Sequence, residues 1–484
     1  MSKNVLKEGK TAQNTWFVKN EEKIERNSEI LHELQHDLEN RHVTEPKHST
    51  KVQAATKSLS HLISLAAETL PDLNSDHFGK LFDRYGSKKV VLLGEASHGT
   101  SEFYQARAAI SKRLIEEHGF NIVAIEGDWP DGHSVDRYVR HRSVGNTEKP
   151  FKRFPSWMWK NTDAQAFIKW LHRHNSKLDF EKKVGFYGLD MYSMRESIGQ
   201  VLNYLKRVDP EAARVARDRY NCLSPWLREP AEYGAATLVG LKKCEPGVLE
   251  QLNDLLKNRV EYAKNDGLSF FDAHMNARVV ESAEKYYRVM YYGDAESWNL
   301  RDTHMFETLQ SLMKNVPNGK AIVWAHNSHI GDARATEMGS ERGELNIGQL
   351  CRQAYGDEAA LIGFGTHTGT VTAASKWDSP AQTMRVIPSR PDSYERLCHD
   401  ADKRRFLLDL HKNEHLRKQL MKPLLERFIG VIYRPNTERW SHYTECVLPS
   451  QFDAYVWFDE TKAVTPLRKE HLHEGEPETY PFGL

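Results

Sequence analysis

The sequence predicts an α/β fold with a mostly parallel central sheet flanked by helices. Short apolar runs recur along the chain as they do in buried strands, at residues 90–93, 122–125, 184–189, 322–325 and 361–364. A segment with Phe103, Ala106 and Ile110 on one helical face separates the first two runs. Such a strand–helix–strand unit with short loops implies a right-handed parallel crossover. The polar residues that follow the strands are therefore expected at one edge of the sheet.

Residues 1–50 are rich in Lys, Glu, Asn and His, and we expect a charged helical or partly disordered N-terminal extension there. The first part of the α/β core then spans residues 51–195. Its first crossover helix is expected to stop at Gly119, because a glycine just past the last helical turn is a common C-cap.

A helical insertion is predicted over residues 196–315. This stretch has no clear strand run, and Val279, Ala283 and Tyr286 recur at helical spacing. The second part of the core spans residues 316–475, with helical segments around 391–427 and two further strands at 428–433 and 454–458. Residues 476–484 form a tail.

Composition excludes several classes of partner. Lys and Arg number 67 and Asp and Glu number 67, so the chain lacks the basic excess that nucleic-acid binding requires. No apolar run approaches a membrane span, and the first residues lack a signal-peptide core, so we expect a cytoplasmic protein without a membrane partner. The five cysteines are odd in number and contain no C-x-x-C pair, so no disulfide framework is expected. The sequence does not specify an oligomeric state.

Ionisable side chains follow several predicted strands. Four segments supply them: Glu95 with His98, Arg107, Glu126, and His326 with His329. Histidine can take a proton from water and return it to a leaving group. A nearby carboxylate can fix the histidine tautomer, and an arginine can keep that carboxylate ionised. Their joint occurrence at one sheet edge predicts an active site for water-activating hydrolysis.

Three alternatives remain open from these residues. The same side chains, Glu95, His98, Glu126, His326 and His329, could supply ligands for zinc or manganese. Ser97 could act as a nucleophile, although Glu95 occupies the first glycine position of the G-x-S-x-G elbow. The third alternative is a non-catalytic protein that binds a macrocyclic or aromatic ligand.

Several motifs resemble those of the erythromycin esterase family. They are L-L-G-E-A-S-H-G-T-S-E-F, A-I-E-G-D-W-P, A-H-N-S-H and N-L-R-D-T-H-M, followed by E-R-W-S-H-Y, Q-F-D-A-Y and V-T-P-L near the end. The resemblance extends from about residue 55 to residue 470. It implies an α/β core whose helical insertion covers a deep cleft at the carboxyl ends of the strands. It also implies hydrolysis of a macrolide lactone ester by activated water, without a covalent intermediate.

The resemblance assigns roles to the candidate residues. His98 is the general base, and Glu95 and Glu126 orient and polarise it. Arg107 matches the family's arginine. His326 and His329 match its second histidine pair, which positions water or substrate and, with Arg107, stabilises the developing oxyanion.

The sequence therefore predicts an erythromycin esterase-like hydrolase that cleaves a small-molecule ester, with a link to antibiotic resistance by resemblance. No cofactor is expected under this hypothesis, and a divalent metal belongs to the alternative. The candidate substrate contacts are Trp129, Tyr291, Trp298, Arg301 and Asp302.

Overall fold

The computed structural model describes residues 59–142, 151, 155–238, 240, 243–291, 295–377 and 379–467. The chain from Leu59 onward forms one compact unit. The predicted N-terminal extension (1–50) and tail (476–484) lie outside the described residues. Among the described helices, none is long and apolar enough to cross a membrane.

A nine-stranded sheet forms the centre of this unit, in the order β1-β8-β11-β6-β2-β5-β3-β4, with β7 paired to β6. Its parallel strands are β11 (Ala454–Thr461), β6 (Ala359–Ala373), β2 (Val90–Leu93), β5 (Ala321–Trp324), β3 (Ile122–Asp128) and β4 (Gly185–Asp190). Its antiparallel strands are β1 (Glu68–Thr69), β7 (Gln382–Val386) and β8 (Arg405–Asp409). The predicted α/β fold with a mostly parallel sheet is confirmed. Because the central strands are parallel, their carboxyl ends meet at one edge.

Helices cover both faces of the sheet, since successive strand residues point to opposite sides. Val90 and Leu92 join a core cluster with α12 (Ala295–Asn315) and α15 (Ile347–Tyr355). Val91 and Leu93 join a second cluster with α4 (Ser101–His118) and α6 (Thr162–Asn175). These strands are buried on both faces, which explains their continuous apolar runs.

The crossover helix α4 ends as predicted. Gly119 adopts a left-handed conformation at φ 70°, and its N–H donates to the Leu114 carbonyl. A residue with a β-carbon would be strained in this conformation, so the glycine sets where the helix stops. The next strand, β3, can then begin after a short turn and lie parallel to β2, with β5 between the two.

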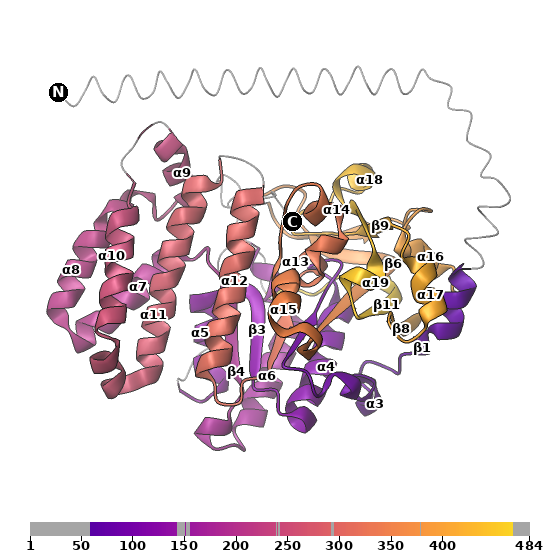
Figure 1. Ribbon diagram of the computed structural model, residues 1–484, viewed down its shortest axis with the longest axis horizontal. Coiled ribbons are helices and arrows are strands. Elements are labelled where there is room, and N and C mark those ends of the chain that lie inside the picture. The colour runs from indigo at the N-terminus through magenta and orange to yellow at the C-terminus, as the bar shows by residue number, and fades with distance from the viewer. Residues whose placement is uncertain are drawn as a thin grey trace. The chain divides into compact units, whose positions relative to one another are not determined.

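The described segments between β4 and β5 are helical. They are α7 (Met194–Val208), α8 (Pro210–Tyr220), α9 (Pro230–Leu238), α10 (Glu245–Lys257), α11 (Arg259–Val289) and α12, with a 3-10 turn at Asn221–Trp226. Helix α11 packs against α7, α9 and α10, and its buried residues include Ala283 and Tyr286. Figure 1 draws α7, α8, α10 and α11 together on one side, next to α12. Helix α12 contacts β3 and β4, so it joins these helices to the sheet.

Two expectations for the last part of the chain are wrong. The segment 391–427 contains α16 (Tyr394–His399) and α17 (Glu414–Leu420), but also strands β8 and β9 (Leu424–Arg427). Residues 428–433 are not a strand of the sheet and make only isolated bridges, from Ile429 to Ser97 and from Ile432 to Ala374. They are buried because they cross the carboxyl edge beside the Ser97 loop, and burial there requires the same apolar residues as a core strand.

The remaining helices and strand have the following bounds. They are α3 (Asp76–Lys80), α5 (Trp129–Val139), α13 (Asn327–Ile330), α14 (Glu337–Ser340), α18 (Glu438–Ser441), β10 (Tyr443–Cys446) and α19 (Leu448–Gln451). Strand β10 pairs with β9 in a separate two-stranded sheet.

One disulfide contradicts the prediction from cysteine spacing. Cys222 and Cys244 are bonded, with Cα atoms 5.7 Å apart, while Cys351, Cys398 and Cys446 are free and buried. The two bonded residues flank α9, and only the folding of the helices around it brings them together. The spacing of cysteines in the sequence does not reveal a pair that only the folded structure brings together.

Candidate active site

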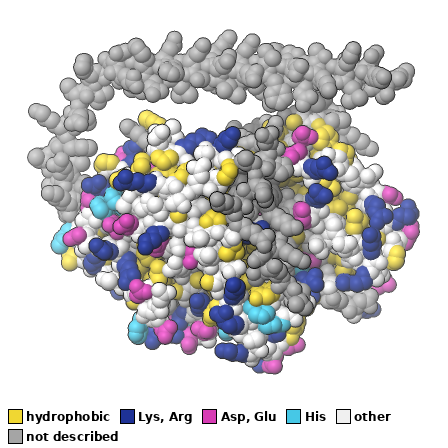
Figure 2. Space-filling view, turned by 180° about the vertical axis from the view of Figure 1, so that it is seen from behind, with side chains coloured by type: hydrophobic (Ala, Val, Ile, Leu, Met, Phe, Trp, Pro, Cys, Tyr) yellow, Lys and Arg dark blue, Asp and Glu magenta, His cyan; other side chains and the backbone are white. Residues whose placement is uncertain are grey.

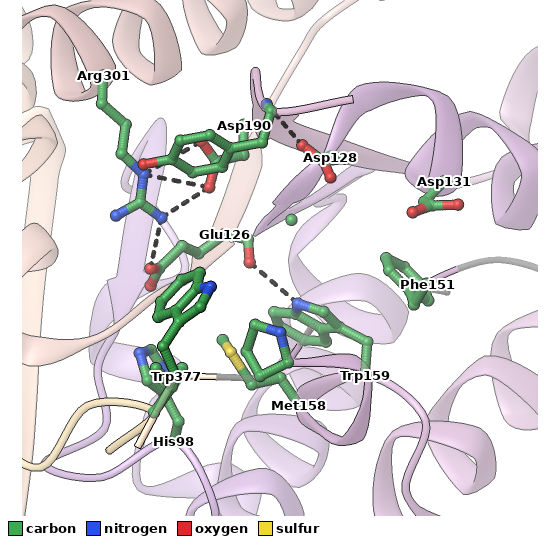
Figure 3. A pocket seen from close by; sticks show the side chains of 14 residues that line it. His98, Glu126, Asp128, Asp131, Phe151, Met158, Trp159, Asp190, Arg301 and Trp377 are labelled. Atoms are coloured by element: carbon green, nitrogen blue, oxygen red, sulfur yellow. Dashed lines mark hydrogen bonds and ion pairs between the residues drawn. The ribbon is translucent and has the colours of Figure 1, made fainter. Parts of the chain in front are cut away.

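A pocket lies at the carboxyl edge of the sheet (Figure 3). Its ionisable lining consists of His98, Glu126, Asp128, Asp131, Asp190 and Arg301. Its apolar lining includes Phe151, Met158, Trp159 and Trp377. Of the residues predicted from the sequence, His98, Glu126 and Arg301 line this pocket directly. The other predicted residues do not line it.

His98 is held by a buried carboxylate. Its Nδ1–H donates to Glu95 Oε1 over 3.0 Å, and both side chains are about 1% exposed. Since the ionised carboxylate only accepts hydrogen bonds, we assign the proton of the neutral ring to Nδ1. Nε2 then carries a lone pair, and the described residues give it no hydrogen-bond partner. His98 therefore presents an unprotonated nitrogen at the pocket.

The loop that carries Glu95 and His98 is fixed by a close approach of two strand ends. Gly94 follows β2, and a β-carbon there would collide with the Asn327 side chain after β5. The Asn327 amide accepts from the Phe364 N–H at 3.2 Å and donates to the Phe364 carbonyl at 2.8 Å, so it also links this loop to β6. Glycine at position 94 thus allows the β2 and β5 loops to pack together.

Arg107 supports Glu95 from behind. Its Nη2 donates to Glu95 Oε2 over 2.6 Å, and its guanidinium lies over the rings of Tyr104 and Trp324, at 4.5 and 5.0 Å from their centroids. It is fully buried and does not line the pocket. The predicted role of an arginine that keeps a carboxylate ionised fits this position. The predicted contact with charge on the substrate does not, since Arg301 is the arginine that lines the pocket.

Glu126 and Arg301 form a second buried assembly. Arg301 Nη2 donates to Glu126 Oε1 at 2.9 Å and to Asp190 Oδ2 at 2.6 Å, and Glu126 Oε2 accepts the His326 N–H at 2.9 Å (Figure 3). Burial opposes ionisation of Glu126, but the neighbouring histidines and Arg301 outweigh it and hold its pKa well below the usual range. The structure gives Glu126 no hydrogen bond to His98. It connects Arg301 to the His326 loop instead.

His329 is enclosed by two carboxylates and an indole. Its Nδ1 lies 3.0 Å from Asp302, its Nε2 lies 3.3 Å from Glu126 Oε1, and Trp298 stacks on its ring at 4.5 Å. Burial lowers its basicity, but Asp302 and Glu126 outweigh burial and raise the pKa of His329 to about 9.

Arg301 Nη1 also lies 3.0 Å from His329 Nε2, a contact that suits only the neutral ring. The neutral and protonated forms therefore compete for this nitrogen. Two carboxylates adjoin the imidazole, whereas the single guanidinium is already neutralised by Asp190. We accordingly assign the protonated ring, which donates to Asp302 and Glu126.

His326 remains neutral. Burial lowers the pKa of His326 well below 6.5. Its Nδ1 accepts from the Ser328 N–H at 3.3 Å and lies 2.8 Å from the Ser328 hydroxyl, which assigns the proton to Nε2. That Nε2–H is buried and makes no well-aligned hydrogen bond among the described residues, with the Ala96 backbone as its neighbouring acceptor. The centroids of the His326 and His98 rings are 4.9 Å apart, so the two imidazoles are neighbours at this edge of the sheet.

The contacts of Ser97 indicate a structural role. Its hydroxyl bonds to the Thr100 hydroxyl, it is 1% exposed, and it does not line the pocket. The geometry lacks the serine–histidine hydrogen bond that activates a nucleophilic serine. The partial match to the G-x-S-x-G elbow at Ser97 is therefore explained by a structural contact at the start of α4.

The two carboxylates among the predicted metal ligands are committed to other contacts. Glu95 binds Arg107 and His98, and Glu126 binds Arg301 and His329. The Arg301 guanidinium lies between Glu126 and Asp190, where a cation shared by two carboxylates would sit. No group of three or more His, Cys, Asp or Glu side chains among the described residues has a metal-binding arrangement. The donor set does not fit a metal ion.

Four predicted substrate contacts lie outside the pocket lining. Asp302 and Trp298 hold His329, as described above. Trp129 is buried, stacks on Tyr187 and donates its indole N–H to Asp272 at 2.9 Å. Tyr291 is half-buried and packs against the helical core. Their aromatic character reflects packing between the helices and the sheet.

The sequence analysis missed other lining residues. Asp190 ends β4, so the strand-end pattern that selected Glu126 also pointed to it. Asp128 ends β3 and fits the same strand-end pattern, whereas Asp131 in α5 and Trp159 in a loop lie where no pattern distinguishes a pocket residue from a surface one.

Comparisons with known proteins agree with this fold. The chain is 23% identical to the putative hydrolase YbfO of Bacillus subtilis over 86% of this chain and 94% of that protein. It is 23% identical to erythromycin esterase type II of Escherichia coli over 63% of this chain and 75% of that one.

Solved structures show the same fold. A Bacillus cereus protein matches with a TM-score of 0.74 at 21% identity, over 85% of this chain and 99% of that one. A histidine-to-asparagine mutant of erythromycin esterase EreC in its open conformation matches with a TM-score of 0.62 at 18% identity, over 82% and 98%. Residues 115–461 match the sequence profile of the erythromycin esterase family. The chain therefore belongs to the erythromycin esterase family and is a hydrolase of that family.

Proposed function

We propose that this chain hydrolyses a carboxylic ester with water activated by His98, without a covalent enzyme intermediate. The free Nε2 of His98 at the pocket carries this proposal, because Glu95 fixes the ring in the tautomer that a general base needs. Arg107 keeps a cation against Glu95, so the carboxylate stays available to stabilise the imidazolium.

The reaction proceeds in two proton transfers. His98 Nε2 takes a proton from water while the water oxygen bonds to the ester carbonyl carbon. The tetrahedral intermediate then collapses, the carbon–oxygen bond to the alcohol breaks, and His98 returns the proton to the departing alkoxide. The products are an acid and an alcohol, and the histidine ends in its starting state.

Two groups are suited to stabilise the negative charge on the carbonyl oxygen. Arg301 places guanidinium N–H donors at the pocket wall, where Asp190 and Glu126 hold it in position. His326 contributes a buried Nε2–H that makes no well-aligned hydrogen bond among the described residues, and such a donor gains from an acceptor on a ligand. Both ring nitrogens of His329 are engaged by Asp302 and Glu126, so it positions Glu126 instead.

The finer proposal concerns the substrate and the setting. Erythromycin esterases are among the relatives, so we propose macrolide lactones as the first esters to examine, with a role in the response to these antibiotics. We also propose that the enzyme works without a metal ion and is cytoplasmic. A non-catalytic macrocycle-binding protein is the rival, and turnover separates the two.

The test is a panel of simple esters and macrolides, with products identified by the mass of one added water. His98→Asn should reduce turnover by roughly 10³-fold or more, because it removes the general base. Exposed His415 provides the matched control, and His415→Asn should retain the wild-type rate. Ser97→Ala and chelator-treated protein should also remain active.

Each outcome has a distinct meaning. A folded His98→Asn protein with the wild-type rate contradicts the assignment of the base. If simple esters are hydrolysed and macrolides are not, the mechanism stands and the macrolide proposal is rejected. Binding without turnover across the whole panel rejects the enzyme proposal altogether.

A further inference from the structure

A second cavity lies among three helices outside the active-site pocket. Its volume is about 420 Å³, against about 70 Å³ for the pocket at His98, and within the range of small-molecule sites. Helix α5 lines it with His133 and Arg137, helix α7 with Gln200, Asn203 and Arg207, and helix α11 with Asp272. The α7 residues share one helical face, since they are spaced by three and four positions. We call this cavity the basic groove.

Three arginines of the basic groove have no ion-pair partner. Arg137 and Arg207 are exposed, Arg142 is half-buried, and none of them pairs with a carboxylate among the described residues. The backbone N–H of Arg142 donates to the Arg137 carbonyl at 2.7 Å, which turns Arg142 back toward the end of α5. The three guanidinium groups therefore remain available to a ligand.

The single acidic residue of the groove is already engaged. Asp272 Oδ1 lies 2.9 Å from the Trp129 indole nitrogen, 3.2 Å from His133 Nδ1 and 3.1 Å from the Asn276 amide. All three contacts are made by Oδ1 and fix Asp272 in place, so the groove sets three arginines against this one carboxylate. On the face shown in Figure 2, basic and acidic side chains are interspersed, so a concavity with this excess departs from the general pattern.

We propose that the basic groove binds a small hydrophilic ligand that carries phosphate groups. Guanidinium groups match phosphate oxygens through paired N–H donors, and three of them suit a ligand with more than one negative charge. Gln200 and Asn203 add neutral donors and acceptors for hydroxyl groups. The one aromatic wall, Tyr204, has its ring beneath Arg207 at 5.7 Å, so the groove offers little apolar surface.

The groove is connected to the active site through α5. That helix starts at Trp129, directly after the pocket residue Asp128, and Arg137 lies two turns further along. Trp129 and His133 of α5 both contact Asp272 of α11. A ligand that joins Arg137 to Arg207 therefore ties α5 and α7 together beside the pocket, and we expect it to stabilise the folded chain.

Calorimetric titration of the full chain with inorganic pyrophosphate at low salt tests the proposal. We expect saturable binding at one site and a rise in Tm on addition of pyrophosphate. Arg137→Gln with Arg207→Gln should weaken binding by roughly 10-fold or more, because each guanidinium contributes charge-assisted hydrogen bonds. Each single variant should lose part of that affinity, and this keeps the test valid if the double variant does not fold.

The matched control removes two charges elsewhere. Arg214 and Arg217 are exposed on α8, and Arg214→Gln with Arg217→Gln lowers the net charge equally without touching the groove. Equal losses in both double variants would show general charge attraction and overturn the site. Absence of binding up to about 10 mM pyrophosphate, well above ordinary ligand affinities, would also overturn it. Ester hydrolysis by the groove variants should match the wild type, so this result is independent of the proposed mechanism.

Discussion

His98 depends on two buried side chains that never reach the pocket. Glu95 fixes the tautomer of His98. Arg107, whose guanidinium lies over two aromatic rings, holds Glu95 in place. Glu95 and Arg107 therefore control the base without contacting the substrate. A change in Glu95 or Arg107 should therefore affect the chemical step while leaving substrate binding intact.

Glu95→Gln is expected to lower kcat by roughly 10²–10⁴-fold with little change in KM. The amide of glutamine can donate to His98 Nδ1, which moves the ring proton to Nε2 and removes the base. Arg107→Met should reduce kcat in the same direction, since the buried carboxylate loses its cation. Steady-state kinetics on an ester found in the panel measure both effects.

Glu116→Gln is the control, because Glu116 is exposed on the same helix, α4, as Arg107. It should leave both constants unchanged. A Glu95→Gln enzyme whose KM rises while kcat stays constant would mean that Glu95 binds substrate and does not orient His98.

The sequence predicted the individual residues better than their partners. Glu95 and His98 are three positions apart, and Arg107 lies on the helix that follows their loop. Their closeness in the sequence was therefore enough to group them. Arg107 is buried behind Glu95, whereas Arg301, which was predicted as a substrate contact, lines the pocket from α12. Arg301 is far from Glu126 in the chain, and no local pattern records that contact.

At the scale of elements, apolar runs predicted the parallel strands because those strands are buried on both faces. The same rule failed at residues 428–433, where an irregular segment is buried equally well. It also missed β8, a strand near the sheet edge within a stretch of helical periodicity. Burial and strand pairing are different causes of one apolar pattern.

The disulfide between Cys222 and Cys244 gives a prediction at this scale. It closes a loop of 22 residues around α9, and such a cross-link stabilises a fold by about 3 kcal/mol through the unfolded chain. Reduction with dithiothreitol should therefore lower the Tm of the chain. The double variant Cys222→Ser with Cys244→Ser should start at the lower Tm and should not respond to reductant.

An unchanged Tm of the wild-type protein in reductant would contradict a stabilising disulfide. The bond also bears on the predicted cytoplasmic location, because reducing compartments keep such pairs as thiols. Alkylation of free thiols in protein taken directly from cells, followed by mass measurement, distinguishes three free cysteines from five.

At the scale of the whole molecule, pH acts on stability through His329. Its pKa is raised from 6.5 to about 9 by Asp302 and Glu126, against the effect of burial. The folded chain thus holds a proton that the unfolded chain releases at lower pH. This contribution is fully present below pH 6.5 and is lost as pH rises through about 9.

We expect the free energy of unfolding to fall by roughly 3 kcal/mol from this group as pH rises across that interval. The contribution of Glu426 to the free energy of unfolding also falls as pH rises, because burial raises its pKa to about 8. The wild-type curve alone therefore does not isolate His329. His329→Gln removes the titrating ring and should flatten the upper part of the decline. Urea unfolding of both proteins between pH 6 and pH 10 measures the difference, and the imidazole signal of His329 in the folded wild type gives a second readout by NMR. Parallel curves for the two proteins, or an imidazole that titrates near pH 6, would mean that His329 is neutral and accepts the N–H of Arg301.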